Sequence, residues 1–78
     1  GRSAEAVKEF RAENPCPATG NTRGACRGWE IEHTGPLCAG GADRASNMTW
    51  MRKEDHKAKT RRDLKICREL RALPKRDE

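Results

Sequence analysis

The sequence predicts a small α+β domain in which two short antiparallel strands lie between two helices. Apolar and polar residues alternate with a period of two over residues 28–33 and again over 47–51, which is typical of strands with one buried face. Residues from about 52 to 73 contain many strong helix formers and no glycine or proline, and Pro74 follows them. Because 78 residues rarely form more than one core, we expect a single domain over 1–78.

The first helix is predicted over about residues 4–13. Ser3 precedes it as a suitable N-cap, and Asn14-Pro15 ends it because proline cannot continue a helix. Residues 16–28 then carry glycines, a proline and two cysteines, which is typical of a loop.

The two strands each present a pair of apolar side chains on one face. The alternation points Trp29 and Ile31 inward from the first strand, and Met48 and Trp50 inward from the second. We therefore expect both tryptophans to pack in the core rather than to stack on nucleic-acid bases.

The composition favours a basic domain with a thin core. Only 33% of the residues are hydrophobic, 37% are charged, and the net charge is +5 with a pI of about 9.4. A polyanion is a natural partner for such a chain, although a solvated charged face explains the same excess. No apolar run approaches the roughly 20 residues of a membrane span, so we expect no membrane association.

Two histidines stand at a specific spacing from an acid and an asparagine. Glu32 precedes His33 directly, thirteen residues separate His33 from Asn47, and eight separate Asn47 from His56. With these residues, the chain resembles the HNH endonuclease family over about residues 28–60. The further matching elements are Pro36-Leu37, Gly40-Gly41, Asn47-Met48 and the run HKAKT at 56–60, and the turn CPATG followed by RGAC is similar to a subgroup of small bacterial HNH proteins.

This resemblance implies a ββα-metal domain, here with an added N-terminal helix and a long C-terminal helix. It gives His33 the role of general base, Glu32 and His56 the role of metal ligands, and Asn47 the role of fixing the loop and orienting the base. Two protein ligands leave room for water and phosphate oxygens, which is typical of Mg²⁺, whereas an imidazole ligand also admits Mn²⁺, Ni²⁺ or Zn²⁺. A positioned base and a divalent ion together are the requirements of phosphodiester hydrolysis.

The adjacency of Glu32 and His33 raises a geometric difficulty. Neighbouring residues of a regular strand point to opposite faces, so the two side chains cannot share a site by simple alternation. We therefore expect the strand to end or to bulge there, and Thr34-Gly35-Pro36 is consistent with such a break.

Four cysteines offer either one zinc site or two disulfides. The closely spaced cysteine pairs that hold a structural zinc in many HNH proteins are missing, because nine residues rather than two lie between Cys16 and Cys26. Among the three connectivities, we favour Cys16 with Cys26 and Cys38 with Cys67. Disulfides predict an oxidising location, either the bacterial periplasm or the exterior of the cell.

Basic residues near the motif are candidate contacts to the nucleic-acid backbone. Such contacts position a duplex without reading its sequence, so we expect a monomer that cleaves DNA with little sequence specificity, with RNA as an open alternative. A noncatalytic nucleic-acid-binding module on the same scaffold is the competing function. The candidate contacts are Arg23, Arg27 and Arg44 in the loops and Lys57, Lys59, Arg61 and Arg62 in the last helix.

Overall fold

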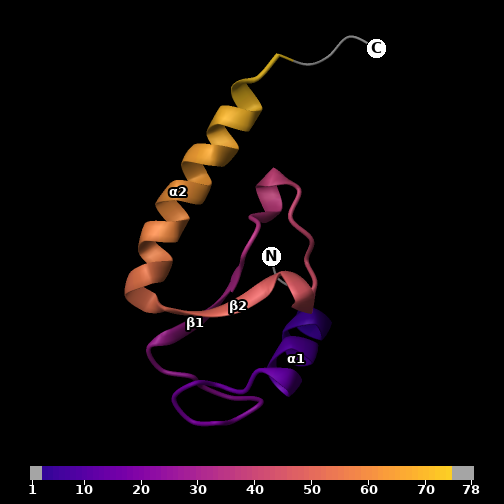
Figure 1. Cartoon of the computed structure of the whole chain (residues 1–78), viewed down its shortest axis with the longest axis vertical. Helices are drawn as coiled ribbons and strands as arrows, with labels where there is room; N and C mark the ends of the chain where they lie inside the picture. The colour runs from indigo at the N-terminus through magenta and orange to yellow at the C-terminus, as the bar shows by residue number, and fades with distance from the viewer. Residues whose placement is uncertain (1–2, 75–78) are drawn as a thin grey trace.

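The computed structural model describes residues 3–74, so both ends of the predicted 1–78 domain lie outside the described residues. It confirms a small mixed α+β architecture of two helices and a two-stranded antiparallel sheet (Figure 1). Along the chain lie α1 (Ala4–Glu13), β1 (Trp29–His33), the short 3₁₀ turns η1 (Leu37–Ala39) and η2 (Ala45–Asn47), β2 (Met48–Arg52) and α2 (Lys53–Ala72).

Helix α1 begins and ends where local sequence predicts. The Ser3 hydroxyl accepts a hydrogen bond from the Ala6 N–H at 3.3 Å, as an N-cap does. At the other end, the Asn14 N–H donates to the Phe10 carbonyl at 2.8 Å, and Pro15 prevents a further turn.

The sheet is regular, and its register assigns each side chain to a face. Ile31 pairs with Trp50, Glu32 with Thr49, and His33 with Met48. Because side chains alternate, Ile31 and His33 lie on one face, whereas Glu32 lies on the other. The first face meets α1 and the second meets α2.

The core lies between α1 and the first face of the sheet. Its buried members are Ala6 and Phe10 from α1, Ile31 from β1 and Met48 from β2. Trp50 packs against this cluster, with its ring centroid 5.9 Å from that of Phe10. So small a core agrees with the low hydrophobic content and leaves much of the stabilisation to covalent links.

Trp29 differs from the expectation that both tryptophans pack in the core. It is half-buried and stands apart from the core cluster, with the Arg52 guanidinium 4.9 Å from its ring centroid. The register explains this position, because Trp29 pairs with Arg52 at the end of the sheet away from His33 and Met48. The cation then covers the ring in place of apolar side chains.

All four cysteines form disulfides, in the pairing that we favoured. Cys16–Cys26 closes the loop between α1 and β1, and Cys38–Cys67 ties η1 to α2. The Cα atoms of each pair lie 5.7 Å apart. The sulfur atoms are therefore engaged with each other rather than arranged around a zinc ion.

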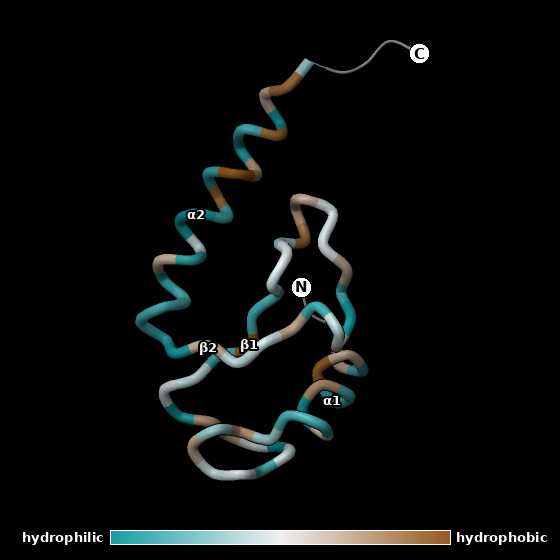
Figure 2. The backbone as a smooth tube through the Cα atoms, in the orientation of Figure 1, coloured by the Kyte–Doolittle hydropathy of each residue, from teal (hydrophilic) through white to brown (hydrophobic). Residues whose placement is uncertain are grey.

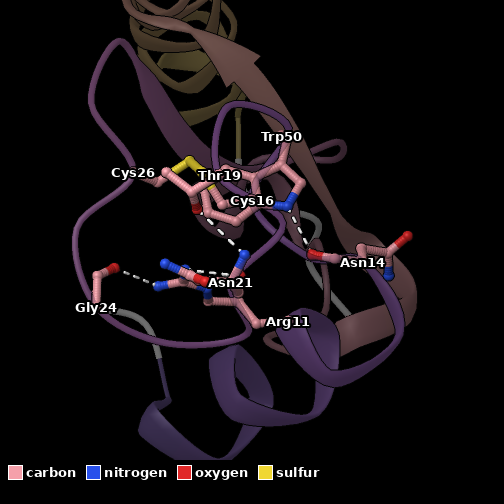
Figure 3. Close-up of a disulfide and its surroundings, with 8 residues drawn as sticks. All are labelled: Arg11, Asn14, Cys16, Thr19, Asn21, Gly24, Cys26 and Trp50. Atoms are coloured by element: carbon pink, nitrogen blue, oxygen red, sulfur yellow. Dashed lines mark hydrogen bonds between the residues drawn. A yellow bond between two sulfur atoms is a disulfide. The ribbon is translucent and has the colours of Figure 1, made fainter.

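Figure 3 shows the surroundings of the Cys16–Cys26 disulfide, which include Arg11 and Asn14 at the end of α1 and Trp50 of β2. The Trp50 indole N–H donates to the Asn14 carbonyl at 2.7 Å, and the Arg11 guanidinium lies 5.2 Å from the Trp50 ring centroid. Arg11 also donates to the carbonyls of Gly24 and Asn21 at 2.7 and 3.2 Å. These contacts attach the 16–28 loop to α1, and they attach the C-terminal end of α1 to β2.

Helix α2 packs on the sheet with its first turns and then extends away from the body (Figure 1). Its distal half is rich in apolar residues (Figure 2), and these are largely exposed. Within residues 3–74, no helix combines the length and the apolar character that crossing a membrane requires. The exposed apolar side chains of the distal half are Leu64, Ile66 and Leu70, with Leu73 directly after the helix.

Candidate functional site

The ionisable side chains of the candidate site lie near the end of β1, on the two faces of the sheet. Glu30 and Glu32 point toward α2, where His56 and Lys59 meet them. His33 points to the opposite face and meets Asp43 from the loop between the strands. The site therefore has two halves that share one strand end.

In the first half, the His56 imidazole lies between two carboxylates. Its Nε2 atom is 3.0 Å from Glu30 Oε2, and its Nδ1 atom is in contact with Glu32 Oε2. The Thr60 hydroxyl stands 3.4 Å from the same Nε2 atom, one helical turn further on. Nδ1 is buried and makes no hydrogen bond, although a carboxylate oxygen faces it.

Glu32 and His56 are the side chains of this half that could serve as ligands to a divalent ion. A histidine that binds a metal through one nitrogen commonly donates its other N–H to a carboxylate, and Glu30 is placed to accept from Nε2. A carboxylate oxygen and an imidazole nitrogen are ligand types that Mg²⁺, Mn²⁺ or Zn²⁺ accept. Glu32 and Nδ1 are here in direct contact, so the two side chains would have to separate for an ion to enter.

The described residues offer no more than this pair as direct ligands. Within residues 3–74, no three His, Cys, Asp or Glu side chains are grouped so that they could hold a metal ion. An ion at Glu32 and His56 would therefore complete its shell with water or substrate oxygens.

Lys59 completes the first half and differs from its predicted role. The residue is only 7% exposed, and its ammonium contacts the Asp63 carboxylate and stands 3.8 Å from Glu32 Oε1. Lys59 lies three residues after His56, and thus on the same face of α2, which turns it toward the sheet. It is thus an internal counter-ion of Glu32 rather than an exposed contact for a phosphate.

In the second half, His33 is buried and paired with Asp43. His33 is 8% exposed, and its Nε2 atom lies 2.9 Å from Asp43 Oδ1. The other carboxylate oxygen accepts the Ser3 N–H at 2.8 Å. The pKa of Asp43 is lowered chiefly by the hydrogen bond from His33 and also by that from Ser3, although desolvation acts in the raising direction.

Asn47 fixes the loop that carries Asp43. Its side-chain oxygen accepts the Gly35 N–H at 2.9 Å, while its amide nitrogen donates to the carbonyls of Gly35 and Ala42 at 2.9 and 2.8 Å. Its own carbonyl accepts the Thr34 N–H at 2.8 Å. The amide therefore joins both ends of the loop, in the position that the resemblance implied for it.

Two glycines allow this loop to close tightly. Gly40 has a φ of +86°, which glycine adopts without strain. At Gly41, an added Cβ would stand 2.0 Å from the Gly35 carbonyl oxygen, so no larger residue fits there without a shift of the backbone. The loop is therefore folded tightly at these two glycines.

Glu32 and His33 do not converge in the way that a bulge would have allowed. β1 ends at His33, as one form of the expectation required, but its pairing is regular up to that residue. Glu32 and His33 therefore leave the strand on opposite faces.

The other predicted phosphate contacts are exposed but do not surround the site. Lys57 and Lys59 are two residues apart, which places them about 200° apart around α2. Lys57 and Arg61, four residues apart, share a face that points away from His56 and Lys59. The exposed candidates are Arg23, Arg27 and Arg44 in the loops and Lys57, Arg61 and Arg62 on α2.

Two acids of the site were not singled out by the sequence pattern. Glu30 could have been found, because it precedes Glu32 by two residues and so shares its face of the strand. Asp43 has no such signal, since its position depends on how a long loop closes.

Comparison of the chain with models of protein families, with curated proteins and with solved structures finds no match.

Proposed function

We propose that the protein is a metal-dependent endonuclease of the ββα-metal type that hydrolyses phosphodiester bonds of DNA. The observation that supports this proposal most strongly is that α2 brings His56 against Glu32, with Glu30 on the other ring nitrogen, where a carboxylate commonly orients a histidine that binds a metal.

The residues divide the chemical work between the two halves of the site. Glu32 and His56 would hold the ion, and the ion when bound supplies charge stabilisation to the phosphate and the leaving oxygen. His33 takes the proton of the attacking water, which is a task suited to an imidazole near neutral pH. Asn47 holds the loop in place while this occurs.

The two halves are joined by a substrate that crosses the end of β1. Glu32 and His33 are neighbours at the strand end, but their side chains leave it on opposite faces. A phosphate would therefore have to lie beyond the end of β1 to meet both side chains.

The proposed substrate class rests on the exposed cations of the loops and of α2. Arginine and lysine side chains on two loops and on α2 suit a sequence-independent contact with the DNA backbone, and RNA offers the same phosphates. The two disulfides favour the periplasm or the exterior of the cell as the location of a monomeric enzyme.

Removal of the carboxylate that orients His56 should weaken metal binding. We expect Glu30→Gln to lower Mn²⁺ affinity and cleavage about 10- to 100-fold, as loss of such supporting groups does, and Glu32→Gln to lower both further. Titration with Mn²⁺ followed by electron paramagnetic resonance measures the affinity. Glu54→Gln, an exposed acid in the first turn of α2, is the matched control and should bind Mn²⁺ like the wild type. Equal Mn²⁺ affinities for the wild type and all three variants would show that Glu30 and Glu32 do not support a metal site.

Salt should weaken binding to DNA in proportion to the phosphates contacted. We expect Lys57→Ala and Arg61→Ala each to reduce the slope of log affinity against log salt by about 1, because each releases one counter-ion fewer. Fluorescence anisotropy with a labelled duplex measures the slope. Lys8→Ala, an exposed cation on α1, is the control. If the α2 variants keep the wild-type slope, this face of α2 does not contact the DNA.

A noncatalytic nucleic-acid-binding module is the second candidate, and one observation favours it. His33 is buried and lies on the opposite face of the sheet from Glu32, as a histidine retained for structure would. Tight, salt-dependent binding of DNA without cleavage in Mg²⁺, Mn²⁺, Ni²⁺ or Zn²⁺ would support this candidate against the enzyme.

A further inference from the structure

Asp43 connects three separate parts of the chain. One carboxylate oxygen meets His33 at the end of β1, and the other accepts the N–H of Ser3 at the start of α1. The preceding carbonyl, that of Ala42, is held by Asn47. The carboxylate is therefore fixed from both sides before any substrate binds.

We propose that Asp43 is a positioning residue that fixes the tautomer and orientation of His33, and that α1 takes part in the site by holding Asp43 through the Ser3 N–H. This inference rests on the proposed nuclease function. It adds to that function a residue and a helix that lie outside the segments assigned to the base and the metal.

The tautomer follows from the chemistry of the partner. A carboxylate can only accept hydrogen bonds, so Nε2 of His33 must carry the hydrogen that lies between the two residues. In the neutral imidazole, Nδ1 then has the lone pair and is the nitrogen that takes a proton. The negative charge of Asp43 also stabilises the imidazolium that forms, as a buried carboxylate does in hydrolytic triads.

The lowered pKa of Asp43 is consistent with this role, because it keeps the carboxyl group ionised at neutral pH. The Asp43 carboxylate acts through its charge and by orienting the His33 ring, and it does not itself receive the proton. A merely structural partner would require only a hydrogen-bond acceptor, which an asparagine also provides. The variant Asp43→Asn therefore separates the two interpretations.

The first readout is the tautomer itself, which needs no activity. In ¹⁵N-detected spectra of the wild type at pH 8, we expect the His33 ring to carry its hydrogen on Nε2. In Asp43→Asn, the amide can also present its NH₂ group, so we expect a mixture of tautomers or the Nδ1–H form. A wild-type ring with hydrogen on Nδ1, or the same single tautomer in both proteins, would overturn the proposal.

The second readout is the separate change in kcat and in KM when a labelled duplex is cleaved with Mn²⁺. We expect Asp43→Asn to lower kcat about 10- to 1,000-fold and to change KM less than about threefold, since the base is misdirected while the phosphate contacts remain. Glu5→Gln is the matched control, because it neutralises an exposed acid in the first turn of the same helix and leaves Asp43 and its partners in place.

These outcomes separate the inference from the proposed function. If the wild type does not cleave, the nuclease proposal fails, and the spectra alone decide whether Asp43 sets the tautomer. If the wild type cleaves and Asp43→Asn has the same kcat, Asp43 is structural. A loss in Glu5→Gln as large as that in Asp43→Asn would likewise assign the effect to the fold rather than to the carboxylate of Asp43.

Discussion

We expect replacement of His33 by alanine to abolish cleavage of plasmid DNA while binding of DNA persists, and this is the largest effect that we expect. A positioned general base contributes about 10²- to 10⁴-fold to the rate, so the residual rate should fall by at least that lower factor. Binding should remain because the exposed cations of the loops and of α2 are untouched. The measurement is conversion of supercoiled plasmid to the nicked form beside a binding assay on the same protein.

The design must separate lost chemistry from lost structure, because His33 is buried beside the core. His33→Asn is the second variant, since its amide N–H can still donate to Asp43 but cannot act as a base at neutral pH. Both variants should retain the helical circular dichroism of the wild type. Cleavage at the wild-type rate by either folded variant would refute the assignment of His33 as the base.

Removal of the Cys38–Cys67 disulfide should cause the largest loss of stability. The two cysteines are 29 residues apart, and the loop-closure relation gives about 3.6 kcal/mol for a loop of that length. Cys67 is 2% exposed, so alanine is the better replacement because serine would bury a hydroxyl group. We expect the Cys38→Ala, Cys67→Ala protein to unfold at much lower urea concentration than the wild type.

The Cys16→Ala, Cys26→Ala protein is the matched comparison. Its disulfide spans 10 residues, for which the same relation gives about 2.7 kcal/mol, so the loss should be smaller. Cys38–Cys67 also fastens the loop that carries Asp43 and Asn47 to α2. A smaller loss from the 38–67 pair than from the 16–26 pair would contradict its expected role as the main covalent tie.

The elements of the fold were predictable because their signals are local. The bounds of α1 follow from Ser3 and Pro15, and both strands and α2 begin within about one residue of their predicted starts. The period of two also placed Ile31, Met48 and Trp50 on the core face. The disulfide pairing was predictable because a loop-closing pair left only one other pair to form.

The parts that escaped prediction depend on how distant segments meet. The alternation of apolar and polar residues allows a core position for Trp29. Only the strand register shows that Arg52 stands opposite it. In the sequence, Lys59 is indistinguishable from the surface cations around it. Only the packing of the first turns of α2 places it beside Glu32. Asp43 reaches His33 only because Asn47 and the glycines close the loop, and no periodic pattern encodes that closure.

Nicking of supercoiled plasmid by the wild-type protein, with divalent ions added one at a time and then removed by a chelator, tests the central claim most directly. Conversion to the relaxed form should require Mg²⁺ or Mn²⁺, stop when the chelator is added and resume with excess ion. A folded protein with both disulfides formed that binds the plasmid and leaves it intact with every ion, or that cuts it at the same rate in chelator, would contradict the claim.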